Sequence, residues 1–415
     1  MTRILRRTAA TAAVLLALPL SLLAAAPAPA APLSLTATAT TGSAADSTGS
    51  ATTAASDTGS ANTADAQVRV ELPRPTGPFA VGRQILSLVD QDRPDPWVPS
   101  AGPRRLMVSV YYPARPGTGG PAPYMTAEAA RLLLADRGAA GVIPVEAVTG
   151  ARTWSRTDAV PHPGRFPLVV LSPGFTLPRT TLTSLAEDLS SRGYVVALVD
   201  HTYENTGTTF PDGRTLPCTV CHTLRTPEQW AALDASRATD ISFVIDRLTA
   251  RDHPDWAYSR MVDPRRIGVA GHSAGGAATV PALLSDARIR AGVDLDGTLD
   301  FPVPDSGLHG KPFLLVGHPL PGPEDATWTD AWARLDGWKR WLTVAGTDHA
   351  SFTDNPLFAE AFGLPAQPGT TIRAERGVEL TRRYVAAFFD LQLKGVPQPL
   401  LDGPDPTAPE VGFHA

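Results

Sequence analysis

The segment 267–284 constrains the fold of this chain more than any other. It consists of Ile-Gly-Val-Ala-Gly-His-Ser-Ala-Gly-Gly-Ala-Ala-Thr-Val-Pro-Ala-Leu-Leu, where an apolar run typical of a buried strand passes directly into small residues typical of a closely packed helix. The junction, Gly271-His272-Ser273-Ala274-Gly275, is G-x-S-x-G between a strand and a helix. Its glycines let strand and helix approach closely, and the strained turn makes the serine hydroxyl project. The pattern predicts an α/β sheet that presents Ser273 as a nucleophile.

Strand-like and helix-like patterns alternate along the rest of the chain, which indicates a mostly parallel sheet with helices on both faces. The continuous apolar runs 166–172 and 194–200 are typical of central parallel strands, because such strands are buried on both faces. Together with the serine turn, this alternation predicts the α/β-hydrolase fold. The other expected strands are 83–90, 106–112, 266–270, 289–294, 312–317 and 340–345, and the expected helices are 126–135, 181–192, 230–248, 274–284, 330–338 and 379–393.

A serine nucleophile needs a base, and in this fold the order along the chain is serine, acid, histidine. His349 is the best of the nine histidines, because it follows the last strand of the parallel series and can reach the serine from that strand's carboxyl end. His318, after the preceding strand, is the second choice. His272 adjoins the serine but is expected to pack inward, and Asp348 is expected to face away from His349.

The acid must follow a strand between the serine and the base. Asp294 and Asp296 lie in Gly-Val-Asp-Leu-Asp-Gly, and the next strand has no carboxylate after it until Glu324. Asp296 is favoured because it lies at the strand tip just before a glycine, whereas Asp294 still lies within the strand. The sequence therefore predicts Asp296 as the residue that orients His349.

The tetrahedral intermediate of acyl transfer needs two N–H donors for its oxyanion. One is expected from the backbone of Ala274 at the start of the helix. The other is expected from the loop Ser172-Pro173-Gly174-Phe175, where the glycine allows a sharp turn and the N–H of Phe175 can point inward. The ring of Phe175 can serve at the same time as wall packing.

The chain has two cysteines, Cys218 and Cys221, in Leu-Pro-Cys-Thr-Val-Cys-His. A disulfide within the loop is expected for an exported protein. The same letters fit a c-type haem attachment or a redox dithiol. A haem would require a second axial ligand, and a thioredoxin-like pair would open a helix after a strand, whereas prolines and a glycine make this context a loop.

The first residues are expected to be an export signal rather than part of the fold. Three arginines precede an uncharged, alanine- and leucine-rich run over 8–26, and small residues suit a cut near Ala30. We therefore expect a signal peptide over 1–31, an unstructured Thr/Ala/Ser-rich spacer over 32–66 and a single catalytic domain over 67–415, in a secreted protein.

Composition narrows the range of functions. The apolar fraction is 43%, which supplies a full core, and the formal net charge is −5, without a basic stripe. A nucleic-acid partner is therefore not expected. The serine chemistry requires no metal and no cofactor.

At this point the chain resembles the plasma, isoform II type of platelet-activating factor acetylhydrolase. The loop at Phe175 departs from the His-Gly-Leu-Gly of the animal enzymes. The elbow around Ser273, the acid at Asp296 and the base loop at His349 all match the family pattern, so the resemblance supports Asp296 independently. The further matching segments are 77–82, 93–97, 105–113, 386–395 and 399–401.

The resemblance implies hydrolysis, without calcium, of short or oxidised acyl groups at the sn-2 position of phospholipids, as in a 1-alkyl-2-acetylglycerophosphocholine esterase. The expected partner is an ester or phospholipid substrate, with transient contact to a lipid surface. Short acyl chains in dissolved esters are expected because 124–160 holds only one plausible covering helix. Two other functions stay open: a triacylglycerol lipase or polyester hydrolase, and a non-catalytic exported binding module.

Overall fold

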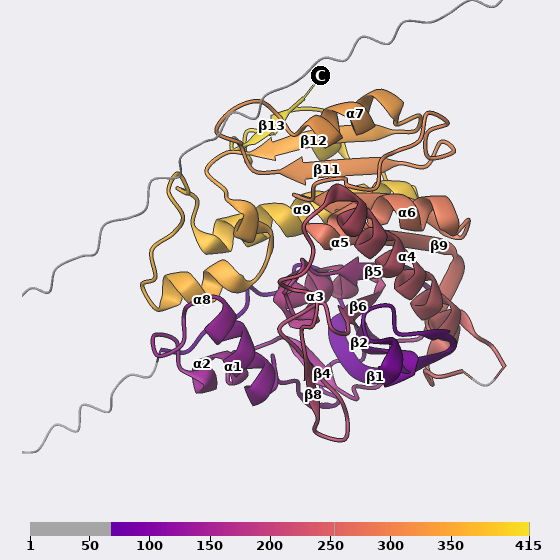
Figure 1. Cartoon of the computed structure of the whole chain (residues 1–415), viewed down its shortest axis with the longest axis vertical. Helices are drawn as coiled ribbons and strands as arrows, with labels where there is room; N and C mark the ends of the chain where they lie inside the picture. Colours follow the sequence, from indigo (N-terminus) through magenta and orange to yellow (C-terminus); the bar gives the residue numbers. More distant parts are fainter. Residues whose placement is uncertain (1–67, 253, 415) are drawn as a thin grey trace, which may run out of the picture. The chain divides into compact units, whose positions relative to one another are not determined.

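In the computed structural model, residues 68–252 and 254–414 are described, and within them eleven strands form one sheet (Figure 1). The expected signal peptide and spacer lie outside the described residues. The strand order is β13-β12-β11-β10-β9-β5-β6-β2-β1-β4-β3. The strands are β1 (Ala80–Pro94), β2 (Pro103–Ala114), β3 (Gly120–Pro121), β4 (Ser155–Thr157), β5 (Phe166–Ser172), β6 (Val195–His201), β9 (Val262–His272), β10 (Ile289–Leu295), β11 (Phe313–Gly317), β12 (Lys339–Val344) and β13 (Val411–Phe413).

The centre of the sheet is parallel, from β6 through β5, β9, β10 and β11 to β12. Antiparallel pairing joins β1 to β2, β2 to β6 and β12 to β13. All of β6 is buried, and so is β5 after its first residue. This double burial explains why both strands are continuous apolar runs in the sequence. The predicted mostly parallel α/β-hydrolase sheet is therefore correct.

Helices cover both faces of the sheet, as predicted (Figure 1). Alternate residues of β5 point to opposite sides: Leu168 and Val170 belong to the apolar cluster that includes residues of α4, α6 and α7, whereas Val169 and Leu171 belong to the cluster that includes residues of α3 and α9. The helices are α1 (Ala127–Asp136), α2 (Val145–Thr149), α3 (Thr183–Ser191), α4 (Pro227–Thr249), α5 (Ala274–Ala277), α6 (Thr279–Ser285), α7 (Ala326–Arg334), α8 (Asn355–Ala361) and α9 (Ala374–Lys394).

Several predicted helices differ in their bounds, including α9, which begins five residues before the expected start at 379, and three of them differ for identifiable local reasons. The helix expected over 274–284 is divided at Ala278, where Pro281 cannot donate the backbone hydrogen bond that would continue it. The helix expected over 330–338 starts earlier, because the Asp325 side chain accepts from the N–H of Thr327 and caps it. The helix expected from 230 likewise starts at Pro227, behind a capping box at Thr226.

Several short elements are additions to the sequence-based expectation. The strands β7 (Gly207–Thr209) and β8 (Thr215–Pro217) form a separate hairpin, and α2 and α8 pack with α1 around a small apolar cluster. Within 68–252 and 254–414, no helix combines the length and apolarity needed to cross a membrane.

Candidate active site

Ser273 lies in the turn between β9 and α5, as the sequence predicts. Its backbone has φ 55° and ψ −130°, and its N–H donates to the carbonyl of Leu295 at 2.8 Å. The turn leaves no room for side chains at the flanking glycines. A Cβ on Gly271 would lie 2.2 Å from the Gly275 backbone, and one on Gly275 would lie 2.0 Å from the Ser172 carbonyl oxygen. Both glycines are therefore required by the strained turn that exposes the serine.

Asp296 follows the end of β10 with a positive φ of 62°, and its N–H donates to Val316 on the neighbouring strand at 2.9 Å. The Nδ1 of His349 donates to the Oδ2 of Asp296 at 2.6 Å. Burial opposes ionisation, but hydrogen bonds from His318 and His349 hold the pKa of Asp296 well below its usual range. Asp296 is therefore an ionised acceptor that fixes which ring nitrogen of His349 carries the proton.

Asp294 has a different environment. It lies within β10, is fully buried, and its Oδ1 accepts from the N–H of Gly297 at 2.9 Å. Burial raises the pKa of Asp294 well above its usual range despite that hydrogen bond. A Cβ on Gly276 would lie 1.8 Å from the same Oδ1, so the carboxyl is packed directly against the helix that follows the serine. Asp294 is a buried structural group, and Asp296 is the carboxylate that contacts His349.

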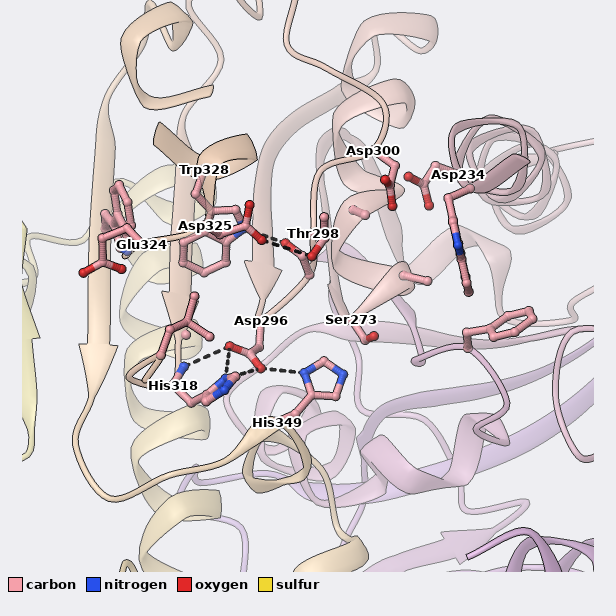
Figure 2. Close-up of a pocket in the computed structure, with 18 of the residues that line it drawn as sticks. Asp234, Ser273, Asp296, Thr298, Asp300, His318, Glu324, Asp325, Trp328 and His349 are labelled. Atoms are coloured by element: carbon pink, nitrogen blue, oxygen red, sulfur yellow. Dashed lines mark hydrogen bonds and ion pairs between the residues drawn. The ribbon is translucent and has the colours of Figure 1, made fainter. Parts of the chain in front are cut away.

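His349 begins a short 3-10 turn after β12, and its side chain is 52% exposed. Figure 2 shows its ring between Asp296 and Ser273. Asp348 faces elsewhere, as predicted. Its Oδ1 accepts from Ser351 at 2.8 Å and its Oδ2 from Thr370 at 2.8 Å, which holds the loop that carries His349.

His318, the second choice for the base, lies on the opposite side of Asp296 from Ser273 (Figure 2). Its Nδ1 donates to both carboxylate oxygens, at 2.8 and 2.7 Å, and its backbone N–H donates to Oδ1 at 2.9 Å. The hydrogen bond and the charge of Asp296 raise the pKa of His318. Its signal in the sequence is its place directly after β11, because adjacent parallel strands end side by side.

His272 is buried beside the base loop, as expected for a packing residue. Its Nε2 donates to the backbone carbonyl of His349 at 2.7 Å, and the two rings lie 4.6 Å apart. Burial and the neighbouring His349 lower the pKa of His272 to about 3. A neutral imidazole with Nε2 protonated fits this contact and holds the loop of His349 in place.

The two expected oxyanion donors lie at the same cavity as Ser273. The N–H of Ala274 is the first of α5, where a helix offers no acceptor of its own, and that of Phe175 has no acceptor among the described residues. The loop before Phe175 is held from behind: Arg237 donates to the Pro173 carbonyl at 2.6 Å, and Thr176 N–H donates to the Glu204 carbonyl at 2.9 Å.

Two groups of side chains have the spacing of metal ligands within the described residues. One consists of Asp296, His318 and His349, whose mutual hydrogen bonds are given above. The other is the buried set of His201, Glu204 and Asp240. In this second set Asp240 accepts from Arg104 at 2.7 Å and Glu204 accepts from Arg237 at 2.7 Å. Guanidinium groups therefore supply the positive charge that the buried carboxylates require.

The cavity at Ser273 has a volume of about 450 Å³ and is open to solvent on one side. Its walls combine aromatic rings with carboxyl groups, and none of the described residues that line it is a lysine or an arginine. Phe175 and Trp230 form an edge-to-face pair 4.9 Å apart. The other aromatic and acidic lining residues, besides Asp296, are Trp328, Trp341, Asp234, Asp300, Glu324 and Asp325.

The two cysteines are joined in a disulfide within the loop after β8. Both sulfurs are used, so the thioether bonds of a haem and the free thiols of a dithiol are incompatible with this state. The bridge lies against the turn that precedes the hairpin, because Thr219 N–H donates to the Tyr203 carbonyl at 3.0 Å.

Comparison with known proteins identifies the family to which this chain belongs. The sequence model described as platelet-activating factor acetylhydrolase, isoform II, matches residues 65–214 and 255–393. The chain belongs to this family. A curated relative from Arthroderma benhamiae, named probable 1-alkyl-2-acetylglycerophosphocholine esterase, is 30% identical over 82% of this chain and 93% of its own length.

Other relatives of this chain match a smaller part of its length or carry a different name. The acetylhydrolase of Bos taurus is 25% identical over 46% of this chain and 48% of its own. A bis(hydroxyethyl) terephthalate hydrolase of Streptomyces coelicolor is 30% identical over 37% of this chain and 39% of its own length. The solved structure of a ferulic acid esterase from Streptomyces cinnamoneus matches with a TM-score of 0.75 and 44% identity, covering 83% of this chain and 99% of that one.

Proposed function

We propose that this chain is a carboxylic ester hydrolase that works through Ser273, His349 and Asp296. Membership of the acetylhydrolase family and the esterase names of its relatives support ester hydrolysis. The observation that carries the triad is the 2.6 Å hydrogen bond from His349 Nδ1 to Asp296, with Ser273 on the other side of the ring.

The proposed reaction has two halves. The Oγ of Ser273 attacks the ester carbonyl while Nε2 of His349 takes its proton, and Asp296 stabilises the imidazolium that forms. The N–H groups of Phe175 and Ala274 hold the oxyanion. His349 then gives the proton to the departing alcohol, which leaves an acyl-serine. Water, deprotonated by His349, attacks this acyl-serine and releases the acid.

The first candidate substrate is a phospholipid with a short or oxidised sn-2 acyl group. The family and the Arthroderma benhamiae relative support it. The cavity supports it through Glu324 and Asp325 beside Trp328, because carboxylates and an aromatic face attract the quaternary ammonium of a choline headgroup. A short acyl chain fits because Leu133 and Leu134 line a separate cavity rather than extending the one at Ser273.

A second candidate is an ester of a compact aromatic acid. It is favoured by the 44% identity to a ferulic acid esterase and by the aromatic pair of Phe175 and Trp230. The absence of lysine and arginine from the residues that line the cavity also favours an uncharged ester over one that carries a phosphate.

Labelling with a fluorophosphonate tests the triad. Wild-type protein should react at Ser273, and Ser273→Ala should neither react nor hydrolyse p-nitrophenyl acetate above about 10⁻⁴ of the wild-type rate. Ser306→Ala, at an exposed serine, is the matched control and should keep both properties. Retained activity in Ser273→Ala contradicts the triad, and absence of labelling in the wild type favours a binding module.

Substrate class follows from kcat/KM over p-nitrophenyl esters of two to twelve acyl carbons. We expect the maximum at the short end, in solution and without an oil interface. A maximum at eight carbons or more favours a triacylglycerol lipase, because each buried methylene adds about 0.8 kcal/mol in a long apolar groove.

We also propose that the protein is secreted. The basic start and the apolar run over 8–26 support export. Mass spectrometry of protein from the culture medium should give an amino terminus near residue 31. An intact protein found only inside the cell contradicts this proposal.

A further inference from the structure

The carboxyl group of Asp234 has no role in the proposed triad, yet it lines the same cavity as Ser273. It projects from α4 one turn after Trp230, so both side chains lie on one face of the helix. Asp234 is 1% exposed, and its Oδ2 is buried without a hydrogen-bond partner among the described residues. An unpaired buried carboxyl oxygen costs free energy unless something that binds there completes it.

Asp300 lies opposite Asp234 in the same cavity. It comes from the connection between β10 and β11, is only half-buried, and also lines the cavity. Figure 2 shows the two carboxyl groups turned toward each other, on the side of Ser273 away from His318. The carboxyl group of Asp300 is therefore open to a ligand, and the buried carboxyl group of Asp234 lies behind it.

These two groups do not both ionise readily. Burial raises the pKa of Asp234 well above its usual range; Arg237 opposes this, and Asp300 adds to it. Burial and Asp325 also raise the pKa of Asp300. Two carboxyl groups that face each other and whose pKa values are both raised resist double ionisation, so they fit a neutral hydrogen-bonding group better than an anion.

We propose that Asp234 and Asp300 form a recognition site for the hydroxyl group of a hydroxyaryl ester, a phenol held against the rings of Phe175 and Trp230. A hydroxyl is both donor and acceptor, so it can donate to the unpaired Oδ2 of Asp234 and accept from a carboxyl group that is protonated. This inference rests on the proposed ester hydrolysis and narrows it to the second candidate substrate.

The residues that line the site favour a neutral hydroxyl group over a charged ligand. A phosphate or carboxylate meets several carboxyl groups, and none of the described residues that line the cavity is a lysine or an arginine. A quaternary ammonium has no N–H to donate and is too bulky to approach the buried Oδ2 of Asp234. The more exposed Glu324 and Asp325 are the carboxylates that a choline group can reach without desolvation of an inner pair.

The test compares two esters that differ in one group, methyl 4-hydroxy-3-methoxycinnamate and methyl 3,4-dimethoxycinnamate. The wild type should favour the hydroxyl ester by about tenfold or more in kcat/KM, because the methoxy ester leaves the carboxyl pair unpaired. Asp234→Leu should lower this ratio to near one. Asp234→Asn, which keeps a neutral donor and acceptor in place, should retain most of it.

Asp330→Asn, at an exposed aspartate of α7, is the control and should keep the wild-type ratio. Thermal unfolding checks that each variant folds, and Asp300→Ala, at the more exposed partner, replaces Asp234→Leu if the latter does not. A wild-type ratio near one, or an unchanged ratio in the folded variants, overturns the inference.

Two further arms separate the possible failures. p-Nitrophenyl acetate reports ester hydrolysis itself: if the wild type hydrolyses neither it nor either cinnamate, the proposed function has failed. The second arm compares acetylcholine with 3,3-dimethylbutyl acetate, its uncharged isostere. A preference for acetylcholine that Asp234→Leu abolishes assigns the pair to a cation and overturns the hydroxyl assignment.

Discussion

The imidazole of His318 donates from Nδ1 to the Oδ2 of Asp296 at 2.7 Å, the same oxygen that accepts from His349 at 2.6 Å. The carboxylate is thus held from two sides, with the rings of the two histidines 6.3 Å apart. His349 lies on the side of Ser273, and His318 lies on the opposite side of Asp296, directly after β11 (Figure 2). In the proposed triad His318 is therefore a positioning residue, because it contacts the proposed acid Asp296 and acts on His349 only through that carboxylate.

Replacement of His318 should separate the hydrogen bond from the packing. His318→Leu should lower kcat by about 10- to 100-fold with little change in KM, because Asp296 loses a donor that fixes its orientation. His318→Asn keeps an N–H near Nδ1 and should lie within about fivefold of wild type. The acidic limb of the pH profile of kcat/KM should move to higher pH in His318→Leu, because His349 no longer shares the Asp296 carboxylate with a second donor. Equal losses in both variants with an unmoved profile indicate a structural role only.

Amide substitutions distinguish the two neighbouring aspartates of the β10 tip. Asp296→Asn should lower kcat/KM for p-nitrophenyl acetate by about 10³- to 10⁴-fold, because an amide holds the wrong tautomer of His349. Asp294→Asn should stay within about tenfold, since the raised pKa of Asp294 already favours its neutral form. If both variants fold and Asp294→Asn is the more damaged, the acid has been assigned wrongly.

The contact between Gly276 and Asp294 predicts a stability effect. Gly276→Ala would put a Cβ 1.8 Å from a buried carboxyl oxygen, so the free energy of unfolding should fall by about 3 kcal/mol. Gly403→Ala is the matched control, because a Cβ there meets nothing within 4 Å. Urea unfolding measures both. Equal stabilities would show that the segment around Gly276 relaxes freely.

Asp354 predicts a pH dependence of stability. It accepts from the Ser184 backbone at 3.2 Å and from the Tyr124 hydroxyl at 3.3 Å, and burial raises its pKa to about 7. The pKa of Asp354 in the folded state exceeds its value near 3.9 in the unfolded state. Protonated Asp354 therefore contributes its full stabilisation below about pH 3.9, and this contribution is lost as the pH rises to about 7. From pH 5 to pH 8 the wild type should lose about 2 to 3 kcal/mol relative to Asp354→Asn, measured by denaturant unfolding at each pH. A difference that does not change with pH contradicts the raised pKa.

The disulfide can be checked by mass spectrometry of the purified protein. Reduction should add the mass of two hydrogen atoms to the peptide that contains Cys218 and Cys221. Because the closed loop is very short, replacing both cysteines by serine should cost about 2 kcal/mol or less. Free thiols before reduction, or a haem adduct, contradict the assignment.

The sequence alone predicted the elements whose signals are local. The serine turn was predictable because its glycines are required within a few residues of Ser273, and the continuous apolar runs identified the central strands because burial on both faces removes any alternation. The place of Asp296 at a strand tip was also predictable from its neighbours. Helix bounds were less accurate where a cap or a proline decided them, as at Thr226 and Pro281.

The tertiary structure decided the relationships that depend on strands distant in sequence. His318 and His349 follow adjacent parallel strands, and only their lateral order brings both imidazoles to one carboxylate. Asp234 and Asp300 lie 66 positions apart in the sequence and face one cavity because α4 packs beside the connection after β10. Local propensity carries no information about such pairs, since their approach is set by the packing of whole elements against the sheet and not by the residues between them.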